Sequence, residues 1–170
     1  MKKYILTVII TLSSSAFAQT PIPPQKPVMV VTEIGEVAGS NDKIQVLVVS
    51  QIDSKKISGS IQIKDKGMMG GNFEIDAAIA LQLSKLLDEA SNKLLAGTMF
   101  SGKAGTANVS VVEASGQKSV VIEFDREGIS FSTNTLRLDA DNASGLSRII
   151  IRAKQTSDWL SPKLGALQPK

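Results

Sequence analysis

The 170-residue chain contains no histidine and no cysteine. Their absence excludes histidine-based acid–base catalysis, Ser-His-Asp and Cys-His nucleophilic sites, and most zinc, haem, copper and iron–sulfur centres. It also excludes disulfides, so a folded form must be stabilised by packing. Aromatic residues make up only 4% of the chain, which leaves few rings for stacking nucleic-acid bases. We therefore expect a non-enzymatic protein with no catalytic residue, no cofactor and no metal.

The chain also lacks an apolar run long enough to cross a bilayer. Its N-terminal run, residues 4–12, follows Lys2 and Lys3 and precedes small residues that end in Ala18. This pattern is typical of a secretory signal peptide over residues 1–18, cleaved before Gln19. The sequence thus predicts a periplasmic or secreted protein, with a retained membrane anchor as the alternative.

Neither sign of charge is in clear excess once the signal is removed. The whole chain has 19 basic and 16 acidic residues, and cleavage leaves 17 and 16. A mature chain so close to neutral has no overall field that selects nucleic acid or an anionic membrane.

Residues 19–27 contain four prolines and predict an extended linker. A ligand for a proline-binding groove is the alternative. The folded domain is expected over residues 28–155, with a C-terminal tail over residues 156–170.

The helix signal is strongest over residues 75–95, where apolar side chains recur every three or four positions. Asp76 is the expected N-cap and Gly97 the expected C-terminal stop. β-Branched or alternating segments predict strands before and after this helix. They lie at residues 28–32, 44–50, 57–65, 98–102, 107–114, 119–124 and 129–132.

A second, weaker helix is expected from Asp139 to Ala153. Gly145 and the β-branched run of residues 149–151 leave a strand over residues 147–154 as the alternative. At an offset of 63 residues the two halves agree at many positions. The matches include Gly39 with Gly102, Val46 with Val109, Asp76 with Asp139, Leu83 with Leu146 and Ser84 with Ser147. Residues 65–67 match residues 126–128 at an offset of 61, which implies a compensated two-residue insertion.

The sequence therefore predicts an α+β fold of two tandem ββββα units, residues 28–96 and 97–155, with antiparallel sheets packed on two helices. This element order resembles that of the Whirly family. The resemblance implies single-stranded nucleic-acid binding, which the near-neutral charge and the few aromatic residues disfavour.

Three short patterns have a chemical and a structural interpretation. Residues 40–43 have the Ser-x-x-Lys spacing of penicillin-recognising enzymes, but a turn is favoured because they precede a strand. Residues 139–145 resemble a calcium loop, but position twelve is Ile150 instead of glutamate, so helix capping is favoured. Residues 67–71 are rich in glycine, but Glu74 and Asp76 would repel a phosphate, and a connecting loop is favoured.

The remaining candidates are contact residues for another protein. Adjacent methionines Met68 and Met69 suit an adaptable interface, and Trp159 with Leu160 either dock on a partner or fold back on the domain. We expect an exported protein that acts by binding a protein partner or by self-association. The alternatives are an oligonucleotide-binding protein and an enzyme that uses only carboxylate, hydroxyl and amine groups, such as a glycosidase.

Overall fold

The computed structural model describes residues 28–40, 42–52, 57–67, 70–125 and 134–165. Two four-stranded antiparallel sheets follow one another along the chain, each with its strands in sequence order. Sheet A contains β1 (Val28–Ala38), β2 (Lys43–Ile52), β3 (Ile57–Asp65) and β4 (Asn72–Ile75), and α1 (Ala77–Leu95) follows it. Sheet B contains β5 (Phe100–Ala104), β6 (Ala107–Ala114), β7 (Gln117–Phe124) and β8 (Thr135–Leu138), and α2 (Ala140–Gly165) follows it. The expected α+β class with two ββββα units is confirmed.

Alternation of side chains fixes one buried face on each sheet. In the central strands of sheet A, Val46 pairs with Ile63 and Val48 with Ile61, and these four side chains are almost completely buried. In sheet B the corresponding pairs are Val109 with Ile122 and Val111 with Val120. Residues from both sheets and both helices belong to a single hydrophobic cluster, in which the Phe73 and Phe124 rings stack with centroids 4.0 Å apart.

Both helices begin at the expected aspartates. The Asp76 carboxylate accepts a hydrogen bond from the Ile79 amide, and Asp139 accepts one from the Asn142 amide, each at 2.7 Å. These bonds satisfy amides that the first helical turn leaves without partners. At the other end of α1, Gly97 adopts a φ of 70°, a left-handed conformation that glycine adopts without strain.

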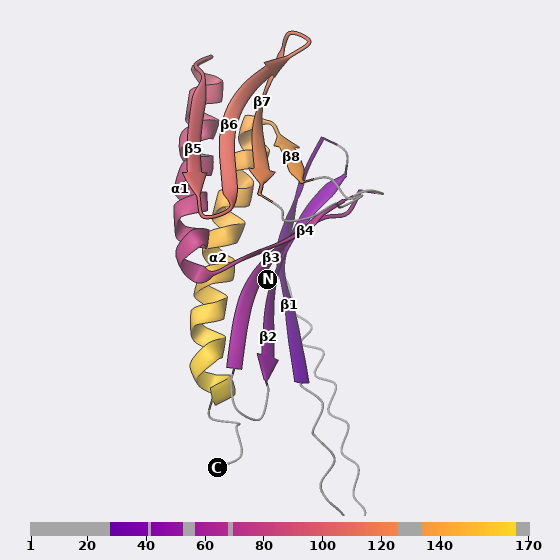
Figure 1. Cartoon of the computed structure of the whole chain (residues 1–170), viewed down its shortest axis with the longest axis vertical. Helices are drawn as coiled ribbons and strands as arrows, with labels where there is room; N and C mark the ends of the chain where they lie inside the picture. Colours follow the sequence, from indigo (N-terminus) through magenta and orange to yellow (C-terminus); the bar gives the residue numbers. More distant parts are fainter. Residues whose placement is uncertain (1–27, 41, 53–56, 68–69, 126–133, 166–170) are drawn as a thin grey trace, which may run out of the picture.

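Each helix packs mainly on the sheet of the other unit. α1 lies against β5, β6 and β7, whereas α2 lies against β1, β2 and β3, and the two helices pack along each other. Figure 1 shows α2 running down the long axis of the molecule past the strands of sheet A. Neither unit therefore encloses its own core.

Glycines in the two edge strands let the exchanged helices approach. Gly35 in β1 faces Ile149 of α2, and Gly102 in β5 faces Leu86 of α1. Leu86 and Ile149 are 63 residues apart, so equivalent helix positions fill equivalent glycine sites. A second close contact places Val37 beside Gly145, which explains a glycine inside α2.

Hydroxyl groups join the helices at their interface. Ser147 Oγ donates to the Ser84 carbonyl oxygen at 2.9 Å, and Ser91 Oγ donates to the Ala140 carbonyl oxygen at 2.8 Å. Both bonds are buried, so each satisfies polar groups that would otherwise be costly inside the core.

The register of the strands corrects one part of the repeat. Val46 and Val109 are equivalent, yet the β1 residue opposite Val46 is Gly35, while the β5 residue opposite Val109 is Gly102. Gly39 is therefore not the counterpart of Gly102. Equivalent residues of β3 and β7, such as Ile63 and Ile122, are 59 residues apart, because the β2–β3 hairpin is four residues longer than the β6–β7 hairpin. The offset therefore changes by four residues rather than two at this point, and residues 126–128, on which the smaller change was based, lie outside the described residues.

The second helix is confirmed, because residues 147–154 are helical and not the alternative strand. Its expected end was wrong: α2 continues to Gly165, so residues 156–165 belong to the helix rather than to a separate tail. The short strands β4 and β8 were not predicted, and the expected strand at residues 129–132 lies outside the described residues. Neither described helix is long and apolar enough to cross a membrane.

Candidate functional site

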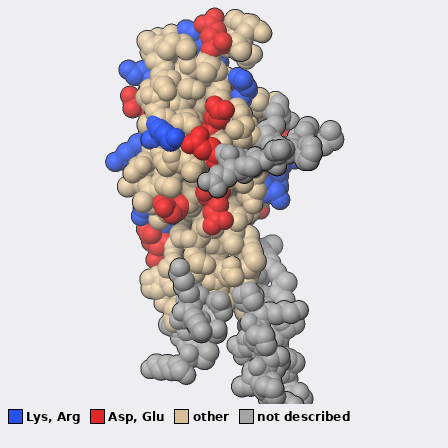
Figure 2. All heavy atoms as spheres, in the orientation of Figure 1, with Lys and Arg blue, Asp and Glu red and all other residues tan. Residues whose placement is uncertain are grey.

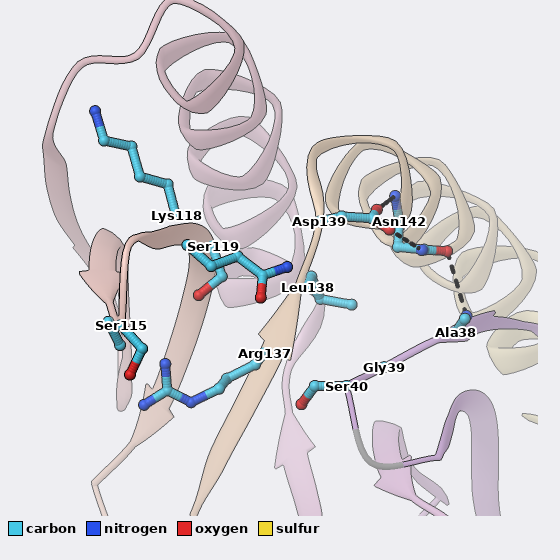
Figure 3. Close-up of a pocket in the computed structure, with 12 residues that line it drawn as sticks. Ala38, Gly39, Ser40, Ser115, Lys118, Ser119, Arg137, Leu138, Asp139 and Asn142 are labelled. Carbon is cyan, nitrogen blue, oxygen red and sulfur yellow. Dashed lines mark hydrogen bonds between the residues drawn. The ribbon is translucent and has the colours of Figure 1, made fainter.

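A cavity of about 520 Å³ lies between the two units, and we call it the inter-unit cavity. The β1–β2 turn contributes Ser40, the β6–β7 turn contributes Ser115, β8 contributes Arg137, and the start of α2 contributes Asp139 and Asn142. Figure 3 shows the Arg137 side chain extending toward Ser115, while the Asn142 side chain is hydrogen-bonded to the Asp139 side chain and to the Ala38 amide.

Two backbone features fix the walls of the inter-unit cavity. The Ser40 amide donates to the Arg137 carbonyl oxygen at 3.0 Å, which ties the β1–β2 turn to the edge of sheet B. Ser115 has a φ of 54° and is followed by Gly116 with a φ of 77°. Two successive residues with positive φ form a tight hairpin turn between β6 and β7. The cavity is thus shaped by ordered backbone from both units.

The charged groups around the inter-unit cavity differ in what they contact. Lys118 Nζ donates to the Gly97 carbonyl oxygen at 2.7 Å and lies 3.9 Å from a Glu113 carboxylate oxygen. Asp139 accepts hydrogen bonds from both the backbone amide and the side-chain amide of Asn142. The Asn142 side-chain oxygen in turn accepts from the Ala38 amide at 3.3 Å.

Arg137 differs from these groups. Its side chain is exposed on the outer face of sheet B and makes no hydrogen bond or ion pair with any described residue. It is therefore the one cation lining the cavity that is not already held by a described neighbour.

A second hollow of about 630 Å³ lies between β1 and α2, and we call it the β1–α2 groove. Its β1 wall consists of Thr32, Glu33 and Ile34, and its α2 wall consists of Arg152, Gln155, Thr156 and Trp159. The α2 residues follow helical spacing, so they share one face of the helix. Trp159 is 58% exposed, and Lys163 Nζ lies 3.7 Å from the centroid of its ring.

The four expected contact residues have different positions. Met68 and Met69 lie outside the described residues. Trp159 lies in the wall of the β1–α2 groove, whereas Leu160 is half-buried and packs against the core. Only Trp159 is thus placed at a described surface site.

The exposed start of β1 was not among the expected contact residues. Val28, Met29 and Val31 are each more than half exposed, and Met29 lines a separate hollow with residues of β2, β3 and β4. Their continuous apolar run was visible in the sequence, but it predicts a buried strand as readily as an exposed one.

The Ser-x-x-Lys pattern lies in a turn, as expected, and a turn hydrogen bond joins the described ends of the glycine-rich pattern. Gly39 donates to the Asp42 carbonyl oxygen at 2.7 Å, and Gly70 donates to the Gly67 carbonyl oxygen at 2.8 Å. Lys43 contacts Glu36 rather than Ser40, and this hydrogen bond lowers the pKa of Glu36 and raises that of Lys43. The turn favoured for residues 40–43 is thus confirmed.

Asp125, whose pKa is also shifted, lies in another exposed ion pair. Lys103 donates to Asp125 at 2.8 Å, and this hydrogen bond lowers the pKa of Asp125. Figure 2 shows basic and acidic side chains interspersed over one face of the molecule. That face carries no continuous basic surface.

No protein-family model and no curated protein matches the chain. Among solved structures, the chain is similar to SsgB, mutations in which correlate to longitudinal cell division during sporulation of Streptomyces coelicolor. The identity is 13%, and the match covers 82% of this chain and 98% of that chain with a TM-score of 0.33. A likeness of this degree carries no argument about function, and the Whirly resemblance stays a prediction.

Proposed function

We propose that this is an exported, non-enzymatic protein that acts through protein–protein contacts, and that β1 with the β1–α2 groove takes up an extended segment of a partner protein. The observation that carries this proposal is the free edge of β1. β1 pairs with β2 on one side, and no described strand pairs with its other side. A strand edge presents unpaired amides and carbonyls to an incoming strand.

The two halves of β1 differ in how they resist such pairing. The register shifts between Glu33 and Gly35, and Glu36 follows, so the C-terminal half has both an irregularity and charge. Bulges and charged side chains are common protections of edge strands. The first five residues of β1, residues 28–32, have neither, and Met29 and Val31 are 61% and 53% exposed. We therefore place the incoming strand along residues 28–32.

The groove specifies the chemistry of that strand. Trp159 offers a large ring that loses little conformational entropy on binding, a common property of residues that dominate interfaces. Arg152 and Lys163 lie on the same side of α2 as Trp159 and outnumber Glu33, the one acidic residue in the wall of the groove, so they complement an acidic side chain. The partner segment is thus extended, mainly apolar, and carries an acidic residue that reaches α2.

A photo-crosslinking amino acid at position 29 tests this assignment. Met99 is the matched control, because it is a methionine of nearly equal exposure, 64% against 61%, and it precedes β5. We expect adducts from position 29 and from position 159 in cells, and few from position 99. Adducts with twice the mass of the chain identify a second copy instead of a different protein. Equal labelling at all three positions, or none at position 29, contradicts the proposal.

Export is the part of the proposal that rests on the sequence alone. Lys2, Lys3, the apolar run and Ala18 support a cleaved signal, and N-terminal sequencing of the protein from the envelope tests it. The expected first residue is Gln19. A protein that begins at Met1 in the cytoplasm contradicts export without affecting the β1 assignment.

Binding of single-stranded nucleic acid has no structural observation in its favour. Trp159 is the one large exposed aromatic side chain in the part of the chain that the structure describes. A stacking platform for successive bases uses several such rings along a basic channel. A gel-shift titration with single-stranded DNA at low salt tests this alternative, and we expect no shift.

A further inference from the structure

Several hydrogen-bond donors that line the inter-unit cavity have no acceptor among the described residues. The guanidinium of Arg137 has no partner among the described residues, and neither do the hydroxyls of Ser40, Ser115 and Ser119. A guanidinium can only donate hydrogen bonds, and a hydroxyl can donate one. A ligand that fits this cavity therefore brings acceptor oxygens.

The charge balance limits the ligand further. Lys118 is held by the Gly97 carbonyl oxygen, and Figure 3 shows its side chain directed away from Arg137. Asp139 remains in the wall as a carboxylate that caps α2. One available cation near one carboxylate suits a ligand group with a single negative charge better than a dianionic phosphate.

The geometry of the guanidinium and the size of the cavity also favour a carboxylate ligand. A guanidinium presents two parallel N–H groups that match the two oxygens of a planar carboxylate. The volume of about 520 Å³ lies within the range of about 300–1,000 Å³ typical of small-molecule sites. No aromatic residue lines the cavity, so a ligand held by ring stacking does not fit.

We propose that the inter-unit cavity binds the carboxylate of a small ligand, with Arg137 holding both oxygens and the surrounding serine hydroxyls completing their hydrogen bonds. The carboxylate belongs either to a small organic acid or to the C-terminus of a short peptide. This site shares no lining residue with the β1–α2 groove, so it stands independently of strand pairing on β1.

The position of Arg137 on a strand gives the site its rigidity. Arg137 lies opposite Val121 in the β7–β8 pair, and the Ser40 amide holds its carbonyl oxygen from the other side. The first unit thus supplies Ser40 and the second supplies Arg137, so the cavity is complete only when the units are packed together.

Nuclear magnetic resonance titrations of the whole protein test the site with four probes at constant ionic strength. These are sodium acetate, N-acetyl-alanyl-alanine with a free carboxylate, the same dipeptide as its amide, and inorganic phosphate. We expect saturable amide shifts at residues 40, 115–119 and 137 with the two carboxylates, and none with the amide. Equal affinity for acetate and dipeptide identifies the organic-acid source, and tighter dipeptide binding identifies the peptide source.

Variants show whether Arg137 is responsible. Arg137→Gln removes the charge with little change in size, and we expect at least tenfold weaker carboxylate binding. Arg137→Lys keeps the charge but loses the two-pronged geometry, and we expect intermediate affinity. Arg148→Gln is the matched control, because Arg148 is an exposed arginine on α2 outside the cavity, and it leaves binding unchanged.

Three results overturn the proposal. They are unchanged affinity in Arg137→Gln, equal binding of the dipeptide amide, and phosphate binding tighter than acetate. Thermal unfolding of each variant confirms that a loss of binding does not come from a loss of fold, since Arg137 is exposed and its replacement leaves the core intact.

Discussion

The two units have the same element order but different sizes. The first three strands have 11, 10 and 9 residues in the first unit, against 5, 8 and 8 in the second. The helices reverse this difference, because α1 has 19 residues and α2 has 26, or about 29 and 39 Å at 1.5 Å per residue. The longer sheet lies under the longer helix only because the helices are exchanged. Helix length is thus matched to the sheet of the other unit.

The largest expected loss of stability comes from replacing the central leucine of either helix. Leu83 and Leu146 are 63 residues apart and both have no exposed surface. Replacing either by alanine leaves a cavity, and we expect each change to lower the free energy of unfolding by about 2–5 kcal/mol. Urea denaturation of L83A and L146A measures both values. A loss below about 1 kcal/mol in one variant alone would show that the two helices are not equivalent in the core.

The next effect distinguishes the two glycine sites. A Cβ at position 102 would lie 2.6 Å from Leu86 Cδ2, whereas a Cβ at position 35 would lie 3.3 Å from Ile149 Cδ1. Leu86 has to move in G102A, so we expect a loss of about 1–3 kcal/mol, and a smaller loss in G35A. Thermal unfolding of the two variants measures the difference. The opposite order would mean that β1 is more tightly packed against its helix than β5.

A smaller effect concerns the helix caps. Asp76→Ala and Asp139→Ala each remove an N-cap, and we expect losses of about 1 kcal/mol. Asp139 also accepts from the Asn142 side chain at 2.8 Å, so its replacement costs more than that of Asp76. Asp88→Ala is the control, because Asp88 is exposed within α1. Equal stability of all three variants would contradict the capping role.

The smallest effect concerns one exposed ion pair from each unit. Contacts with Lys43 and Lys103 lower the pKa of Glu36 and Asp125 below their ordinary values of 4.5 and 3.8. A carboxyl with a lowered pKa stabilises the fold above its ordinary pKa, and this contribution is lost as pH falls through the folded value. E36Q and D125N should therefore lower the melting temperature slightly near neutral pH and not in strong acid. A loss that persists in acid would point to packing instead.

The sequence predicted the fold class, α1 and both caps because each rests on local signals. Periodicity identified the apolar face of α1 through residues such as Leu83 and Leu87, but it cannot say which sheet that face covers. The exchange of helices is a tertiary property without a local signal.

The C-terminal part of α2 was missed for a related reason. Ser157, Ser161 and Pro162 are weak helix formers, and the sequence suggested a tail. Burial of Ser157 and Leu164 against the domain outweighs that weak propensity. Tertiary packing, absent from any local pattern, decides the length of the helix.

The inter-unit cavity could not be predicted either. Ser40 was assigned correctly to a turn, but nothing in the sequence links it to Ser115 or Arg137, which are 75 and 97 residues away. Their proximity depends on the packing of the β1–β2 turn against β8, where the Ser40 amide donates to the Arg137 carbonyl oxygen. Trp159 and Leu160 were selected together, as residues that either dock on a partner or fold back on the domain. The structure separates them, because Trp159 is 58% exposed and Leu160 packs against the core.

Exchange of the helices also constrains the order of events when the chain is made. Sheet A is synthesised before sheet B, but α2, which covers sheet A, follows sheet B in the chain. The apolar faces of β1, β2 and β3 therefore stay uncovered until both sheets and α2 have left the ribosome. Such long-range closure is slow and leaves early strands open to aggregation. A chaperone that holds the nascent chain extended would suit this topology better than rapid folding during translation.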